Sequence, residues 1–172
     1  MYKRQRQGQY DEALEQYEKC LKIRVDKLGH EHLDVAASYN NIGEVHRQTG
    51  QYELAMEQYQ KSLNIKIKVV GHDHLDVATS YNNIGNVYDS QGKYHDALDY
   101  YQKSLKIKIT AVGSDHPSVA DSKYNMARLH KRREETERAR QLFLECEQIY
   151  AKVYGPDHSE TKDAAQQASR CL

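Results

Sequence analysis

The sequence of 172 residues is poor in several residue types: it has no tryptophan, one phenylalanine, two prolines and three cysteines. Three cysteines cannot supply the disulfide framework of a small secreted domain, and they favour a reducing, cytoplasmic compartment. No apolar run approaches the roughly 18 residues that a membrane span needs, and no apolar stretch follows Met1–Arg4 as it would in a signal peptide. We therefore expect no membrane insertion.

The sequence also has no excess of positive or negative charge, because 25 basic residues balance 25 acidic residues. A protein that binds nucleic acid or an anionic membrane without reading sequence needs a net positive surface. The balance therefore predicts that nucleic acid is not a partner.

The most informative feature that is present is a repeat of 42 residues. His-Leu-Asp-Val-Ala at 32–36 recurs at 74–78, and related copies begin at His116 and His158. About 26 of the 42 positions are identical between the first two full copies, and a fixed period of this size is typical of a repeat array. We divide residues 1–172, as one array, into a partial repeat (1–31), three repeats (32–73, 74–115 and 116–157) and a C-terminal capping helix (158–172).

Each repeat predicts two helices. Apolar and aromatic residues recur every three or four positions on both sides of Gly50, and Gly71 follows the second series as a C-terminal glycine would. Ile65–Val69 alternates like a strand, but it lies late in a strong helical pattern, so we assign it to the helix. By alignment, Gly8 takes the place of Gly50, and residues 1–7 form the tail of a first helix. The predicted first helices cover 33–48, 75–90 and 117–132, the second helices 10–28, 52–70, 94–112 and 136–154, and a last helix 159–171.

Six residues of the first full repeat have the spacing of a known family: Tyr39, Ile42, Gly43, His46, Ala55 and Tyr59. They resemble the tetratricopeptide pattern of an aromatic residue, Leu-Gly, Tyr, Ala and Phe. The second full repeat has the same pattern, whereas the third departs from it at Lys123, Ala127 and Glu134. The period of 42 instead of roughly 34 residues, the Gly-x-Asp-His-Pro junction at 113–117 and the Asn-Asn-Ile-Gly segment are similar to the kinesin light chain and nephrocystin branch of this family.

This resemblance implies an all-α, right-handed α-solenoid of helix-turn-helix repeats. Small residues such as Gly43 and Ala55 would let the two helices of a repeat approach, with an aromatic residue filling the space beside them. The eight additional residues of each repeat would extend the second helix by about two turns. The first helices would line a concave groove, as they do in this family.

A candidate peptide-binding site follows from that arrangement. Asn41, Asn83 and Asn125 recur at one repeat position, and an amide can both donate to and accept from the backbone of an extended peptide. The alternative is that these asparagines pack between repeats. The full candidate set comprises Asn40, Asn41, Glu44, Arg47, Asn82, Asn83, Asn86, Asp89, Asn125, Arg128, Lys131 and Arg132.

The predicted function is therefore a protein-protein interaction module that binds a short extended segment of a partner, as an adaptor or scaffold like kinesin light chain. By resemblance the segment would carry an aromatic and acidic residues, and the basic residues Arg128, Lys131 and Arg132 would favour the acids. The alternative is a structural spacer or self-association segment of a larger scaffold or signalling protein, with no dedicated peptide site.

No pattern of catalytic or cofactor-binding residues is found. The sequence has no Gly-rich phosphate loop, Gly-x-Ser-x-Gly or His-Glu-x-x-His motif, so we predict neither an enzyme nor a cofactor. His32 and its three repeat equivalents precede helices, so we expect them to cap a helix or space a turn instead of binding metal.

Two further residue types are assigned from their repeat positions. Cys20 and Cys146 are expected to be small packed residues, and Cys171 is expected to be exposed. The lysines of the second helices are expected on the solvated outer face, with weak binding of acidic partners as the alternative: Lys61, Lys66, Lys68, Lys103, Lys106 and Lys108.

Overall fold

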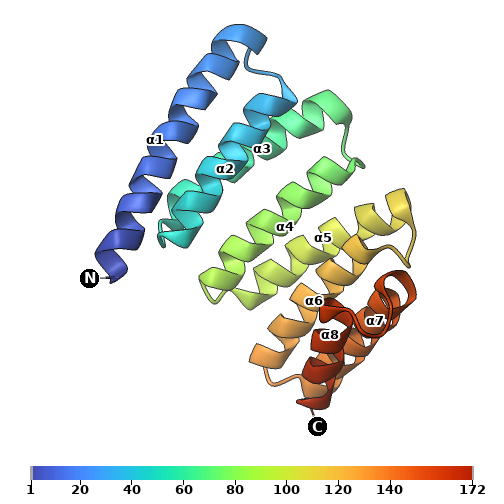
Figure 1. The fold of residues 1–172 in the computed structure, drawn as a ribbon. Coiled ribbons are helices and arrows are strands. Elements are labelled where there is room, and N and C mark those ends of the chain that lie inside the picture. The colour runs from blue at the N-terminus through green and yellow to red at the C-terminus, as the bar shows by residue number, and fades with distance from the viewer. Residues whose placement is uncertain (1, 172) are drawn as a thin grey trace. The chain divides into compact units, whose positions relative to one another are not determined.

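The computed structural model describes residues 2–171, with side chains described from Gly8 onward (Figure 1). These residues form α-helices joined by short turns, and no strand lies among them. The chain divides into two compact units, Met1–Gln91 and Gly92–Leu172. The first unit contains α1 (Tyr2–Leu28), α2 (Leu33–Gln48), α3 (Tyr52–Val70) and α4 (Leu75–Ser90). The second contains α5 (Tyr94–Val112), α6 (Pro117–Arg132), α7 (Thr136–Tyr154) and α8 (Ser159–Ser169).

The helix boundaries follow signals in the sequence. α2, α4 and α6 begin after His32, His74 and His116, and each histidine Nδ1 accepts a hydrogen bond from the backbone N–H two residues on, at 3.1, 3.2 and 3.2 Å. The predicted capping role is thus confirmed for these three histidines, whereas His158 makes no such bond. α3, α5 and α7 each end at a glycine with a φ of 83° to 93°. Residues other than glycine rarely adopt a φ in this range.

The predicted helices at 33–48, 75–90 and 117–132, and those at 52–70, 94–112 and 136–154, are confirmed at both ends. The second helices have 19 residues against 16 in the first helices, so they are longer by three residues, and the extension by about two turns stays a prediction. Ile65–Val69 lies inside α3 as a helix. The last helix ends at Ser169, two residues earlier than predicted.

In the first unit, α2 packs closely against α3 where the helices carry small residues. A Cβ added to Gly43 would lie 3.0 Å from Cδ1 of Tyr59 and 3.3 Å from the carbonyl oxygen of Ala55. Ala55 and Tyr59 are both fully buried. The predicted contact between small residues and an aromatic ring is confirmed for this helix pair. α1 packs on α2, and α3 packs on α4.

In the second unit, α6 and α8 both pack against α7. Phe143 is buried in one cluster with Ala127, Ala139, Ala168 and Cys171. Cys171 is therefore a core residue, and the expectation that it would be exposed is wrong, because the end of α8 folds onto α7. A second cluster comprises Val119, Ala120, Cys146, Ile149, Tyr150 and Ala164.

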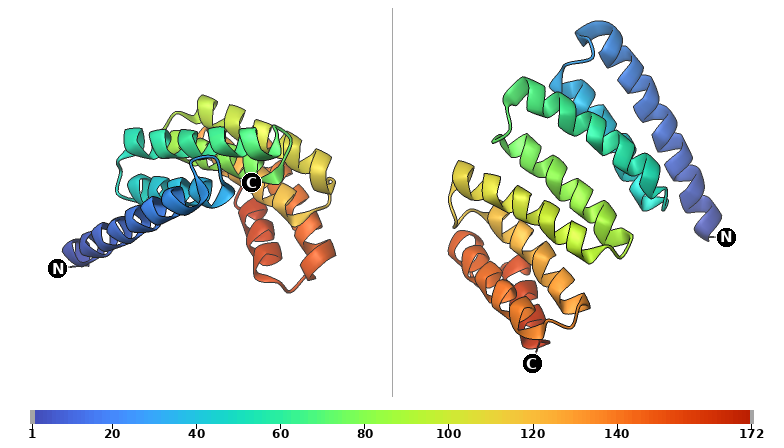
Figure 2. Two further views of the ribbon diagram at one scale, coloured as in Figure 1. Left: turned by 90° about the horizontal axis from the view of Figure 1, so that it is seen from above. Right: turned by 180° about the vertical axis from the view of Figure 1, so that it is seen from behind.

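α1 is longer than predicted. It runs from Tyr2 to Leu28 without interruption (Figure 2), and Gly8 lacks the positive φ that Gly50 adopts at 78°. The expectation that residues 1–7 belong to a separate first helix is therefore wrong for the described residues 2–7, and Met1 lies outside them. The physical reason is that the residues around Gly8 are mostly glutamine and arginine, which favour a helix, so nothing compels the chain to reverse.

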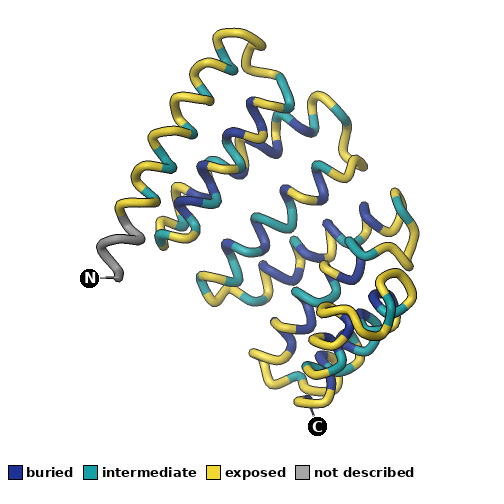
Figure 3. Tube along the Cα trace, viewed as in Figure 1, coloured by how far each residue is buried: buried dark blue, intermediate teal, exposed yellow. Residues whose placement is uncertain are grey.

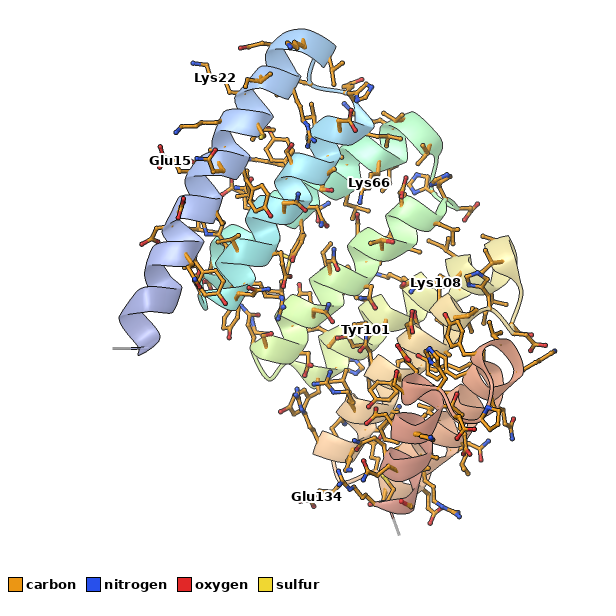
Figure 4. All side chains as sticks on the ribbon, in the orientation of Figure 1. Glu15, Lys22, Lys66, Tyr101, Lys108 and Glu134 are labelled. Atoms are coloured by element: carbon orange, nitrogen blue, oxygen red, sulfur yellow. The ribbon has the colours of Figure 1, made fainter. Side chains whose placement is uncertain are left out.

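Lys66 and Lys108 are buried, with exposed fractions of 7 % and 8 %, so their expected place on the solvated face is wrong (Figure 4). Nζ of Lys66 donates to Ser80 Oγ at 3.0 Å, and Nζ of Lys108 donates to Ser122 Oγ at 2.8 Å. Arg24, at the same repeat position, donates to Ser38 Oγ at 2.7 Å. A cation at this position thus reaches from a second helix to the first helix of the next repeat. The other lysines of the set are exposed, as predicted.

Glu134 takes the turn position that glycine holds in the other repeats, with a φ of 62° (Figure 4). A side chain in this left-handed region is strained, and Glu134 is exposed, so little packing is lost without it. We expect Glu134→Gly to raise the free energy of unfolding by about 1 kcal/mol, measured by urea denaturation. Gly50→Ala should lower it by a similar amount. A glycine variant less stable than the parent would contradict this account of the turn.

Candidate functional site

The first helices of the first unit bring two of the predicted asparagines together. Nδ2 of Asn83 on α4 donates to Oδ1 of Asn40 on α2 at 2.6 Å. Both side chains are half-buried, whereas Asn41 is exposed beside them. α2 and α4 therefore share a polar surface that carries three members of the candidate set. We call Asn40, Asn41 and Asn83 the asparagine surface.

Glu44 organises a second polar group next to that surface. Its carboxylate accepts from Nη2 of Arg47 at 2.6 Å, from Nε2 of Gln48 at 2.6 Å and from the hydroxyl of Tyr59 at 2.7 Å. Burial alone would raise the pKa of Glu44, but these hydrogen bonds hold the pKa below its usual value. Arg47 also donates to Ser90 Oγ on α4 at 3.4 Å. Glu44 and Arg47 thus form an internal network that joins α2 to α3 and α4.

The remaining predicted residues of the first unit lie on α4. Asn82, Asn86 and Asp89 are all half-buried. Asn86 is four residues after Asn82, and Asp89 is three residues after Asn86. The three side chains therefore lie along one side of α4.

In the second unit, the predicted residues are on α6. Asn125 is half-buried, whereas Arg128, Lys131 and Arg132 are exposed in the last two turns. Nζ of Lys131 donates to Gln167 Oε1 on α8 at 3.2 Å. The end of α6 therefore presents a basic group beside α8.

The contacts that Tyr124 on α6 makes with α7 and α8 were not predicted from the sequence. Its hydroxyl donates to Asp163 on α8, and its ring meets Phe143 edge-on with centroids 5.1 Å apart. Burial, with the nearby Asp163 carboxylate, raises the pKa of Tyr124 above its ordinary value. The only sequence signal was that Tyr124 replaces the asparagine of the other repeats.

Two surface depressions were also not predicted. One of about 790 Å³ lies in the second unit between the α5–α6 turn and the end of α7, with Pro117, Asp121 and Tyr154 in its wall. The other, of about 290 Å³, lies in the first unit, with His30, Tyr39 and Lys68 in its wall. Lys68 pairs with Glu31 at 2.6 Å inside the smaller depression, so its charge is already neutralised.

The described residues include no group of three or more metal-ligating side chains close enough to hold an ion. Burial raises the pKa of the Cys146 thiol to about 12, and Sγ donates to the carbonyl oxygen of Ala120 at 3.2 Å. Cys146 is therefore a protonated packing residue, as expected. None of the helices in the described part of the chain is long and apolar enough to cross a membrane.

Comparison with known proteins identifies the family. Models described as tetratricopeptide repeat match residues 4–68, 50–110 and 119–160. The chain belongs to the tetratricopeptide repeat family. Repeats of this family make a non-catalytic interaction scaffold, so the chain is a protein-protein interaction module. No curated protein sequence shows significant similarity to it.

Solved structures share the fold at low sequence identity. A putative kinesin light chain from Podosopora anserina with nearly identical TPR-like repeats is 23 % identical, with a TM-score of 0.78 over 99 % of this chain and 80 % of that chain. BtubC (BKLC) from P. vanneervenii is 20 % identical, with a TM-score of 0.70 over 98 % and 75 %. The apo form of RapI is 16 % identical, with a TM-score of 0.78 over 96 % and 58 %. The fold is an all-α repeat solenoid of the kind seen in kinesin light chain repeats.

Proposed function

We propose that this interaction module binds a short extended peptide of a partner protein along its first helices, as a kinesin-light-chain-like adaptor or scaffold in the cytoplasm. The observation that carries the proposal is the hydrogen bond between Asn40 and Asn83, which aligns amides of two successive repeats with Asn41 exposed beside them. Amides offer donors and acceptors together, so they bind the backbone of a peptide whatever its side chains are.

The charged residues have different roles in this proposal. Glu44 and Arg47 form a short bidentate ion pair with each other. They therefore stabilise the asparagine surface and do not contribute a charge that binds the ligand. Arg128 is exposed on α6 of the second unit, and it attracts acidic residues of a peptide that binds this unit. The ligand class is therefore an extended segment with acidic residues.

Asn41→Ala is expected to weaken peptide binding roughly three- to tenfold, because one neutral hydrogen bond contributes about 0.5–1.5 kcal/mol. The matched control is Gln60→Ala, which removes an exposed amide from α3 on a second helix. An acidic peptide selected from an array is titrated against both variants by calorimetry, and circular dichroism checks the fold. If Gln60→Ala weakens binding and Asn41→Ala does not, the peptide binds the second helices. If no peptide on the array binds, the chain is a spacer or self-association segment.

Arg128→Ala is expected to weaken the binding of acidic peptides but not of other peptides. The loss of affinity should be smaller at about 0.5 M salt than at low salt, because salt screens exposed charges. Titrations of one acidic peptide and its amidated analogue at both salt concentrations measure this effect. A loss of affinity that is equal for the two peptides would contradict the role given to Arg128.

A further inference from the structure

The depression of about 790 Å³ in the second unit has a wall of apolar and acidic residues. The last turn of α7 contributes Val153 and Tyr154, whose exposed fractions of 48 % and 46 % leave apolar surface for a ligand. The start of α6 contributes Pro117 and Asp121. The α5–α6 turn, residues 113–116, is exposed throughout (Figure 3). A ligand in solution can therefore reach both kinds of surface.

The two carboxylates in this wall have different partners. Asp115 is paired with Nζ of Lys152 on α7, so its charge is neutralised. Oδ1 of Asp121 accepts from the hydroxyl of Tyr150 at 2.6 Å, and burial raises the pKa of Tyr150, so the hydroxyl remains a neutral donor. Within the part of the chain that the structure describes, Asp121 forms no ion pair. Oδ2 of Asp121 is therefore available to a donor on a ligand.

One buried cation lies near Asp121 without pairing with it. Burial lowers the pKa of Lys108, and the Asp121 carboxylate opposes this effect. Nζ of Lys108 donates to Ser122 Oγ at 2.8 Å, and Lys108 is only 8 % exposed. Lys108 therefore weakens the negative potential at Asp121 but is not part of the wall. The described residues of the wall include no lysine or arginine, so the wall itself is acidic.

The acidic and aromatic residues of the depression depart from the repeat pattern. Asp121 stands where the earlier repeats have Ala37 and Thr79. Tyr154 stands where the earlier second helices end in a leucine or a valine. The same fold forms in those repeats without a carboxylate or an aromatic ring at these positions. The pattern that specifies the solenoid therefore does not account for this combination.

We propose that this depression binds an arginine side chain of a partner protein, together with an apolar residue next to it. The guanidinium donates to Oδ2 of Asp121, and its planar fork fits a carboxylate better than an ammonium does. The methylene groups of the arginine and the apolar neighbour cover Val153 and Tyr154. A protein segment is the occupant because the chain is an interaction module, and because a depression of about 790 Å³ has room for more than one side chain. The site shares no residue with the asparagine surface, and it does not depend on peptide binding there.

The test compares two blocked hexapeptides by nuclear magnetic resonance titration of the whole chain. One has the sequence Gly-Val-Arg-Leu-Gly-Ser, and the other has citrulline, which is neutral and of similar shape, in place of the arginine. We expect the arginine peptide to bind at least about fivefold more tightly, because it adds a charge-assisted hydrogen bond. The amide resonances that shift should belong to residues 112–121 and 153–154.

Asp121→Asn keeps an acceptor for Tyr150 but removes the charge, so the preference for arginine should disappear. The matched control is Asp163→Asn, because Asp163 accepts from Tyr124 in the other tyrosine–aspartate pair of this unit but lies outside the depression. This control should keep the preference. Circular dichroism checks the fold of both variants, and the comparison of the two peptides on the parent protein does not depend on them.

Four results would overturn the proposal. They are equal affinities of the two peptides for the parent protein, resonance shifts confined to other residues, an arginine preference that survives Asp121→Asn, and a preference that Asp163→Asn also abolishes. Free arginine that binds as tightly as the hexapeptide would overturn the assignment of the site to a segment of a partner protein.

Discussion

Replacing Tyr59 with alanine is expected to lower the free energy of unfolding by about 3–5 kcal/mol, the usual loss for a large buried aromatic side chain. Tyr59 is fully buried, and its ring fills the space beside Gly43. Its hydroxyl donates to Glu44 at 2.7 Å, and burial raises the pKa of Tyr59, so the group remains a neutral donor. The variant therefore loses ring packing and leaves Glu44 with one donor fewer.

Two controls separate these contributions, with urea unfolding followed by circular dichroism. Tyr59→Phe keeps the ring and should lose about 1 kcal/mol for the hydrogen bond alone. Tyr17→Ala removes the equivalent ring from α1, where it is only half-buried, so its effect should be well below that of Tyr59→Ala. Equal losses at Tyr17 and Tyr59 would contradict the difference in burial between the two rings.

The helix boundaries could be predicted because the same sequence pattern occurs four times in the chain. Each histidine before a first helix and each glycine after a second helix marks a boundary, so the predicted ranges hold to the residue in the full repeats. α1 could not be predicted in this way because Gly8–Tyr10 repeats the turn sequence Gly50–Tyr52, yet it lies inside a continuous helix. A glycine permits a positive φ but does not impose one.

Side-chain burial was harder to predict because it depends on helix rotation and on neighbours. Lys66 looks like a surface residue in sequence, but the helix turns it toward Ser80 of the next repeat, 14 residues on. The repeat position alone made Cys20 equivalent to Ser62, yet Cys20 is exposed, so its expected packing is wrong: no helix among residues 2–171 covers it. In the candidate site, the sequence indicated the asparagines but not the bond between Asn40 and Asn83, which depends on how α2 and α4 face each other.

Ser80→Ala is expected to lower the free energy of unfolding by about 1.5–3 kcal/mol, because a hydrogen bond to a charged group is lost and the charge stays buried. Ser80 Oγ accepts from Lys66 at 3.0 Å and donates to the carbonyl oxygen of Asp76 at 3.2 Å. Lys66→Met should behave differently, since it removes the buried charge, keeps the volume of the side chain and leaves Ser80 bonded to Asp76. We expect this variant to be as stable as the parent or about 1 kcal/mol more stable near neutral pH.

The pH dependence of that difference provides the decisive measurement. Burial lowers the pKa of Lys66 below 10.5, and the nearby Asp76 carboxylate opposes this effect only in part. Below the folded-state pKa both states are protonated, and the full cost of burying the ammonium is present. As the pH rises toward 10.5, the folded state loses its proton before the unfolded state does, so the stability of the parent protein increases. Lys66→Met has no such proton, and its advantage should therefore shrink between pH 7 and pH 10. Urea unfolding at several pH values would contradict the buried charge if that advantage stayed constant or grew.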